Sequence, residues 1–139
     1  MYIDSNIFIL AGTDSGKKGK NCRKIIKDID KNGIVCSSSY LVIDEVIWIL
    51  KKKLGKKFAI KLTKKIFSFP IRWVDVNRSI IFKMIEVMEN TKLDPRDALH
   101  LASMKENGIS TIISEDKDFD KLTGIKRVDS SNFVKDYLS

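Results

Sequence analysis

The sequence has few of the residues on which several common active sites depend. Its 139 residues include two cysteines, one histidine and no glycine-rich phosphate loop. Cys22 and Cys36 are too far apart for a CxxC motif and too few for a disulfide framework, which favours buried thiols in a reducing compartment; one disulfide between them is the alternative. His100 lies between leucines, so we expect a packed or surface residue rather than a ligand. These shortages disfavour zinc sites and Ser-His-Asp or Cys-His nucleophiles.

Long apolar runs are also lacking. The chain opens with MYIDSNIFIL, which has a charge at position four and no basic leader. We therefore expect no signal peptide, no membrane span and a cytoplasmic location. An apolar content of 43% is enough for one hydrophobic core, and no repeat, low-complexity tract or Pro/Gly-rich linker interrupts the chain. Residues 1–139 are predicted to form a single domain.

Charge is unevenly distributed along the chain. The segment 15–67 has fifteen lysines or arginines and four acids, whereas the remainder has eleven and fourteen. A basic surface attracts a polyanion such as nucleic acid, and a separate acidic cluster suits a divalent metal. A solvated helix face also explains the lysines, and their excess over arginine, 21 to 5, weakens an inference of bidentate phosphate recognition. Charge alone therefore does not establish nucleic-acid binding.

Strand-like and helix-like segments alternate, which is the pattern of an α/β protein with a parallel sheet. We expect buried strands at Met1–Ile3, Ile34–Cys36, Arg72–Val76, Ser110–Ser114 and Lys126–Asp129. Helices are expected at Asn6–Ala11, Asn21–Lys31, Ser39–Leu54, Lys57–Ser68, Arg78–Asn90, Pro95–Asn107, Lys117–Leu122 and Ser130–Leu138.

Four acids are predicted to meet at the carboxyl ends of these strands, where parallel sheets bind ligands. Asp4 follows the first strand, Glu45 lies in the N-terminal half of the helix after the second, Asp97 lies in the first turn of a helix, and Asp116 follows the fourth strand. Capping is the alternative for Asp4 and Asp116, and Asp97 fits the acidic position of a capping box. The acids thus have a structural and a functional explanation.

Glu45 is harder to explain by capping, because it lies on the apolar side of its helix, where an unpaired carboxylate is costly. Asp44 is rotated from it by about 100°. Periodicity does not say which of the two faces the site. Carboxylates gathered at one edge repel each other, and a hard cation such as Mg²⁺ or Mn²⁺ relieves that repulsion. Metal-assisted hydrolysis is the reaction class that fits.

Four segments in order, YIDSN, SSSYLVIDEVIWIL, LDPRDALHLA and ISTIISEDKDFDKLTGIKRV, resemble the PIN-domain ribonucleases, most closely VapC-type toxins and their archaeal relatives. The resemblance spans Tyr2 to Val128. It implies a parallel sheet of order 3-2-1-4-5 flanked by helices, and commonly a homodimer. It also implies that Mg²⁺ or Mn²⁺ is bound by the acids Asp4, Glu45, Asp97 and Asp116, with Asp118 as an additional ligand. Asn6 and Ser114 match polar positions that orient carboxylates or water.

The activity implied by the resemblance is endonucleolytic cleavage of single-stranded or loop RNA by a metal-activated water. Lysines of the basic region are expected to hold flanking phosphates: Lys51, Lys52, Lys53, Lys56 and Lys57. One alternative is a catalytically weak scaffold that binds RNA or protein. Another is a phosphotransfer domain of the haloacid-dehalogenase kind. That chemistry usually requires a second aspartate two positions after the first, and this position is Asn6. Within the nuclease hypothesis, a toxin held by a VapB-like antitoxin and a stand-alone RNA-processing enzyme both remain.

Overall fold

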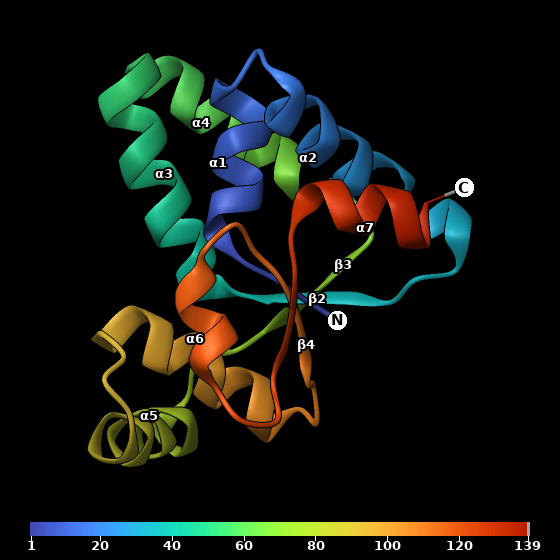
Figure 1. Ribbon diagram of the computed structural model, residues 1–139. Coiled ribbons are helices and arrows are strands. Elements are labelled where there is room, and N and C mark those ends of the chain that lie inside the picture. Colours follow the sequence, from blue (N-terminus) through green and yellow to red (C-terminus); the bar gives the residue numbers. More distant parts are fainter. Residues whose placement is uncertain (139) are drawn as a thin grey trace.

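The computed structural model describes residues 1–138 and contains one central sheet (Figure 1). All strand pairs are parallel, and the strand order is β3-β2-β1-β4-β5. This is the order that the family resemblance implied. The strands are β1 (Tyr2–Ile3), β2 (Cys36–Ser39), β3 (Ile71–Val74), β4 (Thr111–Ile113) and β5 (Lys126–Val128).

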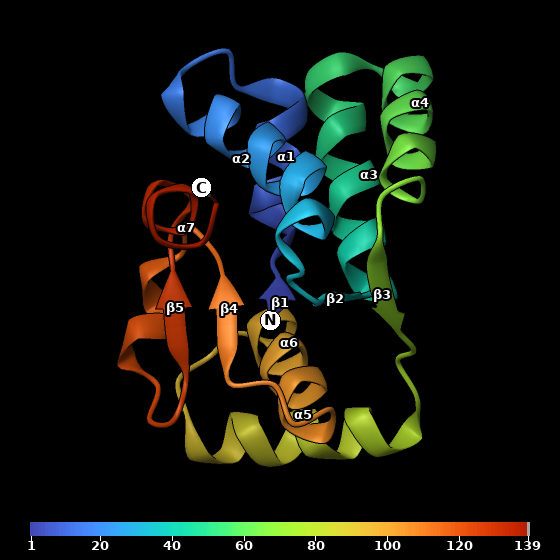
Figure 2. The same ribbon diagram turned by 90° about the vertical axis from the view of Figure 1, so that its right-hand side faces the viewer.

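Helices cover the sheet on both sides. The α-helices are α1 (Ser5–Thr13), α2 (Lys17–Asp28), α3 (Tyr40–Leu54), α4 (Lys56–Ile66), α5 (Arg78–Asn90), α6 (Pro95–Glu106) and α7 (Ser130–Tyr137), with short 3₁₀ helices η1 (Asp30–Asn32) and η2 (Lys117–Lys121). Figures 1 and 2 show α1 to α4 and α7 above the sheet, and α5 and α6 below it. In the part of the chain that is described, no helix is long and apolar enough to cross a bilayer.

The central strand explains why the N-terminus carries part of the site. Tyr2 and Ile3 of β1 are fully buried, as expected for a strand that has neighbours on both sides and helices on both faces. Tyr2 pairs with Ser37 of β2 and with Ile112 of β4. The next residue, Asp4, leaves the sheet at its carboxyl edge and caps α1. The chain therefore begins by placing a carboxylate between two neighbouring strands.

The predicted second strand was wrong by two to three residues. It was expected at Ile34–Cys36, but β2 is Cys36–Ser39. The serines of β2 are buried with their hydroxyls bonded inside the protein: Ser38 Oγ donates to the Ile3 carbonyl at 2.8 Å, and Ser39 Oγ accepts from the Tyr2 hydroxyl at 2.9 Å. A search for apolar runs misses a strand whose buried side chains satisfy their polar groups in this way.

The start of α2 also differs from the prediction, which placed it at Asn21 rather than Lys17. The carboxylate of Asp14 accepts the backbone N–H groups of Gly16 and Gly19 at 3.0 and 2.7 Å, so the first turn forms around that side chain. A Cβ on Gly19 would lie 1.9 Å from the Asp14 carbonyl oxygen, so only glycine allows this close approach. Gly16 and Gly19 therefore lie at the N-cap and in the first turn of the helix.

Candidate metal centre

Asp4 is buried and held by hydrogen bonds on both carboxylate oxygens. Oδ1 accepts from the backbone N–H of Ser5 at 2.7 Å, while Oδ2 accepts from Asn6 Nδ2 at 2.8 Å and from Ser114 Oγ at 2.6 Å. Asn6 Nδ2 also donates to Ser114 Oγ at 3.0 Å. Burial raises the pKa of Asp4, and the charge of His100 and the bond from Ser114 offset only part of that rise. Asn6 and Ser114 thus lie where residues that orient this carboxylate were predicted.

Glu45, and not Asp44, faces the site. Glu45 is buried on α3, with Oε1 2.8 Å from His100 Nε2 and Oε2 accepting from Ser5 Oγ at 2.8 Å. Asp44 is exposed, and Arg96 lies 4.0 Å from its carboxylate. Burial works to raise the pKa of Glu45, but the hydrogen bond and charge of His100 and the bond from Ser5 outweigh it, and the pKa falls below its usual value. The choice that periodicity left open is resolved by these contacts.

His100 is a packed residue, as predicted, but its role at the site was missed. The ring is fully buried, with Nδ1 2.8 Å from the Tyr2 hydroxyl and Nε2 bonded to Glu45. The Tyr2 hydroxyl donates to Ser39 Oγ, so its lone pairs are free to accept from Nδ1–H while Nε2–H donates to Glu45. Burial works to lower the pKa of His100, but the bond to Glu45 and the charges of Asp4, Glu45 and Asp97 outweigh it. The pKa of His100 is therefore raised above its usual value. The signal in the sequence was its spacing of three from Asp97, which puts both on one face of α6.

Asp97, Asp116 and Asp118 form the tightest group of acids. One carboxylate oxygen of each lies within 4.8 Å of one oxygen of each of the others. Asp116 caps η2 by accepting from the Asp118 N–H at 2.9 Å, and its own N–H donates to Ser114 Oγ at 3.0 Å. Asp118, predicted as an additional ligand, therefore lies together with two of the four main acids.

Asp97 differs from the other acids because its carboxylate accepts no hydrogen bond within residues 1–138. Burial and the charges of Asp4 and Asp116 raise its pKa from 3.8 to about 6. The predicted capping box is wrong, since neither Asp94 nor Asp97 makes a side-chain bond to the start of α6. Asp94 does occupy the N-cap position and Pro95 the first helical position, as the sequence predicts. Asp97 is thus a partly buried, unpaired carboxylate that faces other carboxylates.

The donor set suits a hard divalent cation. The five acids offer carboxylate oxygens, the group of Asp97, Asp116 and Asp118 includes no cysteine, and the histidine is already bonded at both ring nitrogens. Mg²⁺ and Mn²⁺ prefer such oxygen donors, whereas zinc prefers nitrogen and sulfur. Burial and the charges of Asp4 and Asp116 raise the pKa of Asp97, and a bound cation would offset the repulsion among these acids.

The loop that carries Asp116 and Asp118 is held by an arginine that sequence reasoning did not identify. Arg127 of β5 donates from Nε and Nη2 to the two carboxylate oxygens of Asp120 at 2.8 and 3.0 Å, and from Nη1 to the carbonyl of Ser114 at 2.9 Å. A planar guanidinium can bridge a carboxylate and a carbonyl in this way. Arg127 thereby ties the end of β4 to η2.

The five lysines predicted to bind RNA lie elsewhere. Lys51, Lys52 and Lys53 are exposed at the C-terminal end of α3, and Lys56 and Lys57 are exposed at the start of α4. Lys52 is seven residues after Glu45, a rise of about 10 Å along the helix. Figure 2 shows α4 at the end of α3 that points away from the sheet. These lysines are therefore not neighbours of the acids.

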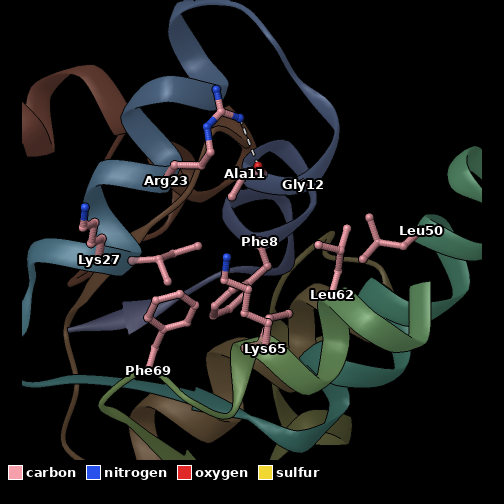
Figure 3. A pocket seen from close by; sticks show the side chains of 11 residues that line it. Phe8, Ala11, Gly12, Arg23, Lys27, Leu50, Leu62, Lys65 and Phe69 are labelled. Atoms are coloured by element: carbon pink, nitrogen blue, oxygen red, sulfur yellow. Dashed lines mark hydrogen bonds between the residues drawn. The ribbon is translucent and has the colours of Figure 1, made fainter. Parts of the chain in front are cut away.

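An apolar cavity of about 430 Å³ lies among α1, α2, α3 and α4 (Figure 3). Its walls include Phe8 and Leu62, with Arg23, Lys27 and Lys65 among the lining residues and no carboxylate. Arg23 is already bonded to the Ala11 carbonyl at 3.0 Å. This cavity is separate from the acidic edge and does not belong to the candidate metal centre.

Comparison with known proteins agrees with the fold. The family model for the PIN domain matches residues 1–125, and the chain belongs to the PIN domain family. A search of curated proteins gave no significant match.

Solved structures of toxin-antitoxin proteins share the fold. The toxin VapC20 of Mycobacterium tuberculosis, which cleaves the sarcin-ricin loop, is 17% identical with a TM-score of 0.71 over 86% of this chain and 92% of that chain. A chain of VapBC2 from Rickettsia felis, bound to a promoter DNA fragment, is 13% identical with a TM-score of 0.73 over 92% and 96%. A chain of DNA-bound VapBC from Salmonella typhimurium is 14% identical with a TM-score of 0.71 over 93% and 96%.

Proposed function

We propose that this PIN-domain protein is a Mg²⁺- or Mn²⁺-dependent endoribonuclease that hydrolyses single-stranded or loop RNA. The observation that carries the proposal is the group Asp97, Asp116 and Asp118, whose carboxylate oxygens lie within 4.8 Å of one another beside Asp4 and Glu45. Carboxylates held this close, one of them with no hydrogen bond of its own among the described residues, suit a divalent cation. Membership of the PIN family and the fold shared with a toxin that cleaves the sarcin-ricin loop favour RNA as the substrate.

The residues proposed to hold the ion are Asp4, Glu45, Asp97 and Asp116, with Asp118 as a further ligand. When bound, the ion supplies an activated water and neutralises charge that develops on the phosphoryl oxygens. The protein contributes the fixed geometry. Hydrogen bonds from Asn6 and Ser114 hold Asp4, and those from His100 and Ser5 hold Glu45.

RNA is proposed to reach the acids along a positively charged surface. The exposed lysines Lys51, Lys52, Lys53, Lys56 and Lys57 attract the RNA backbone and hold phosphates away from the cleavage point. This contribution is independent of RNA sequence and falls as salt rises.

The proposed partner is a VapB-like antitoxin, and the proposed setting is a cytoplasmic toxin-antitoxin pair. Chains of several VapBC complexes share the fold over more than nine-tenths of this chain, which supports the proposal. A homodimer is also proposed, because Tyr40, Trp48 and Phe58 expose about half of their aromatic surface on α3 and α4. Sedimentation of the purified protein measures the oligomeric state, and co-expression with the upstream reading frame tests for an inhibitory partner.

The nuclease proposal is tested with end-labelled RNA in Mg²⁺, in Mn²⁺ and after addition of EDTA. We expect metal-dependent cleavage that Asp4→Asn and Asp97→Asn each reduce by at least a hundredfold, while circular dichroism shows both variants folded. Asp44→Asn, which removes an exposed charge one residue from Glu45, is the matched control and should cleave like the wild type.

Product ends test the mechanism. Because water attacks phosphorus, cleavage should leave 5′-phosphate and 3′-hydroxyl ends. Ends that carry a 2′,3′-cyclic phosphate would mean that the ribose hydroxyl attacks and would refute the proposed mechanism. No cleavage of any RNA with any metal would favour a scaffold that binds RNA or protein.

A further inference from the structure

A second cavity, of about 540 Å³, borders the candidate metal centre directly. Asp97 of α6 and Asp118 of η2 line it, together with residues of the α5–α6 connection and of the segment that follows η2. Its volume falls in the range of about 300–1,000 Å³ that is typical of small-molecule sites. It is the cavity, of the two described, that touches the acids.

The cavity is lined by three acids, Asp97, Asp118 and the exposed Asp94, and by three lysines, Lys92, Lys105 and Lys121. Lys121 is paired with Asp118 at 3.2 Å. Within residues 1–138, the ammonium groups of Lys92 and Lys105 make no hydrogen bond or ion pair, and both residues are exposed. Two unpaired ammonium groups beside an acidic centre form a site for an anion that must lie next to a bound cation.

The remaining walls are suited to more than a bare anion. Leu93, Leu101 and Leu122 provide apolar surface, and Thr91, Thr123 and Asn90 provide neutral polar groups. Asn90 donates its Nδ2 to the Glu86 carbonyl at 2.8 Å, which leaves its Oδ1 as an acceptor. Apolar surface, hydrogen-bonding groups and cations in one cavity match the three parts of a nucleotide: the face of its base, the edge of its base and its phosphate.

We propose that this cavity, which we call the lysine subsite, binds the nucleotide next to the scissile phosphate of single-stranded RNA. The phosphate of that nucleotide contacts Lys92 and Lys105, and its base packs on Leu93, Leu101 and Leu122. The proposal rests on the proposed function, since it names how that same centre receives its substrate. Under this proposal Lys92 and Lys105 contact the phosphate closest to the acids, and the lysines of α3 and α4 do not.

Kinetics of RNA cleavage test the subsite. In the double variant Lys92→Ala/Lys105→Ala we expect KM for a short single-stranded RNA to rise about tenfold, while kcat changes less than threefold. The matched control is Lys61→Ala/Lys64→Ala, which removes the same charge from exposed positions of α4 that have no proposed contact with RNA, and it should raise KM less than threefold. Thermal unfolding should show both variants as stable as the wild type, because all four lysines are exposed. If the control raises KM more than the subsite variant does, the proposal is overturned.

Direct binding separates this proposal from the nuclease itself. Uridine 5′-monophosphate is titrated into protein in EDTA, with inorganic phosphate in a parallel titration, and amide shifts are followed by NMR. We expect the nucleotide to bind at least fivefold more tightly than phosphate, to shift amides of residues 90–93 and 121–123, and to lose affinity in the double variant. Equal affinity for nucleotide and phosphate, or no shift, overturns the subsite. If the protein binds the nucleotide but cleaves no RNA, the subsite stands and the proposed nuclease function is refuted.

Discussion

Replacement of Asp97 by asparagine should stabilise the metal-free protein. The rise of the Asp97 pKa from 3.8 to about 6 means that the folded state disfavours the ionised carboxylate. At 1.36 kcal/mol per unit this corresponds to about 3 kcal/mol at neutral pH. Solvent screening of this partly exposed group reduces the effect to about 1–2 kcal/mol. We therefore expect Asp97→Asn to raise the free energy of unfolding in EDTA by that amount.

The sign of this change separates two explanations of Asp97. A carboxylate that served only the start of α6 would stabilise the helix, and its removal would cost about 0.3–1 kcal/mol. Urea unfolding at pH 7.5 in EDTA, with Asp94→Asn as the charge-matched control, measures the difference. The control should change stability by less than about 0.5 kcal/mol. A destabilised Asp97→Asn protein would refute the reasoning from repulsion.

The pH dependence follows from the same shift. For an acid whose folded pKa is raised, the penalty is complete above the folded pKa and disappears as pH falls toward the unfolded value. The advantage of Asp97→Asn over the wild type should therefore be full above about pH 6 and shrink between about pH 6 and 3.8. Mg²⁺ at one hundred times its dissociation constant should add about 2.7 kcal/mol to the wild type. It should add far less to the variant.

Two other substitutions test the hydrogen bonds around the acids. His100→Gln can retain a donor to Glu45 and should keep Mn²⁺ affinity within about threefold, whereas the shorter His100→Asn cannot reach Glu45 and should lose about tenfold, as measured by calorimetry. Equal losses in the two variants would mean that only packing matters. Ser114→Ala removes the 2.6 Å hydrogen bond to Asp4, so Mn²⁺ affinity should fall about tenfold and stability by about 1–2 kcal/mol in urea unfolding. An unchanged affinity would show that this bond does not orient the ligand.

Much of the fold could be predicted because the central strands β1 and β4 are buried and read as apolar runs. The carboxyl-edge rule then indicated the region of the acids, since it needs only the order of strands and helices. Strand β2 failed this approach because three of its four residues are serines. Their burial depends on partners in other strands, such as Ile3 and Tyr2, and no local pattern reports those partners.

The contacts among the acids could not be predicted for a related physical reason. Periodicity gives the direction of a side chain around its helix, but not which hydrogen bonds it makes across the fold. Glu45 and Asp44 differ by one position, and what separates them is His100 on α6 and Ser5 on α1. His100 itself looked like a core residue by its leucine neighbours, and it is one. Its additional role arises because Glu45 lies on the other side of the ring from Tyr2.

The carboxylates of the site divide into those that the protein holds and one that it leaves free. Asp4 and Glu45 are bonded through both oxygens, so their positions are fixed before any ligand arrives. Asp97 has no hydrogen bond within residues 1–138 and faces like charges, which costs stability. Evolution retains such a cost where a function requires it, because a carboxylate saturated by internal donors has less capacity to bind a cation. The ionised Asp97 carboxylate, which destabilises the metal-free protein, is thus the feature that leaves the proposed metal centre able to bind a cation.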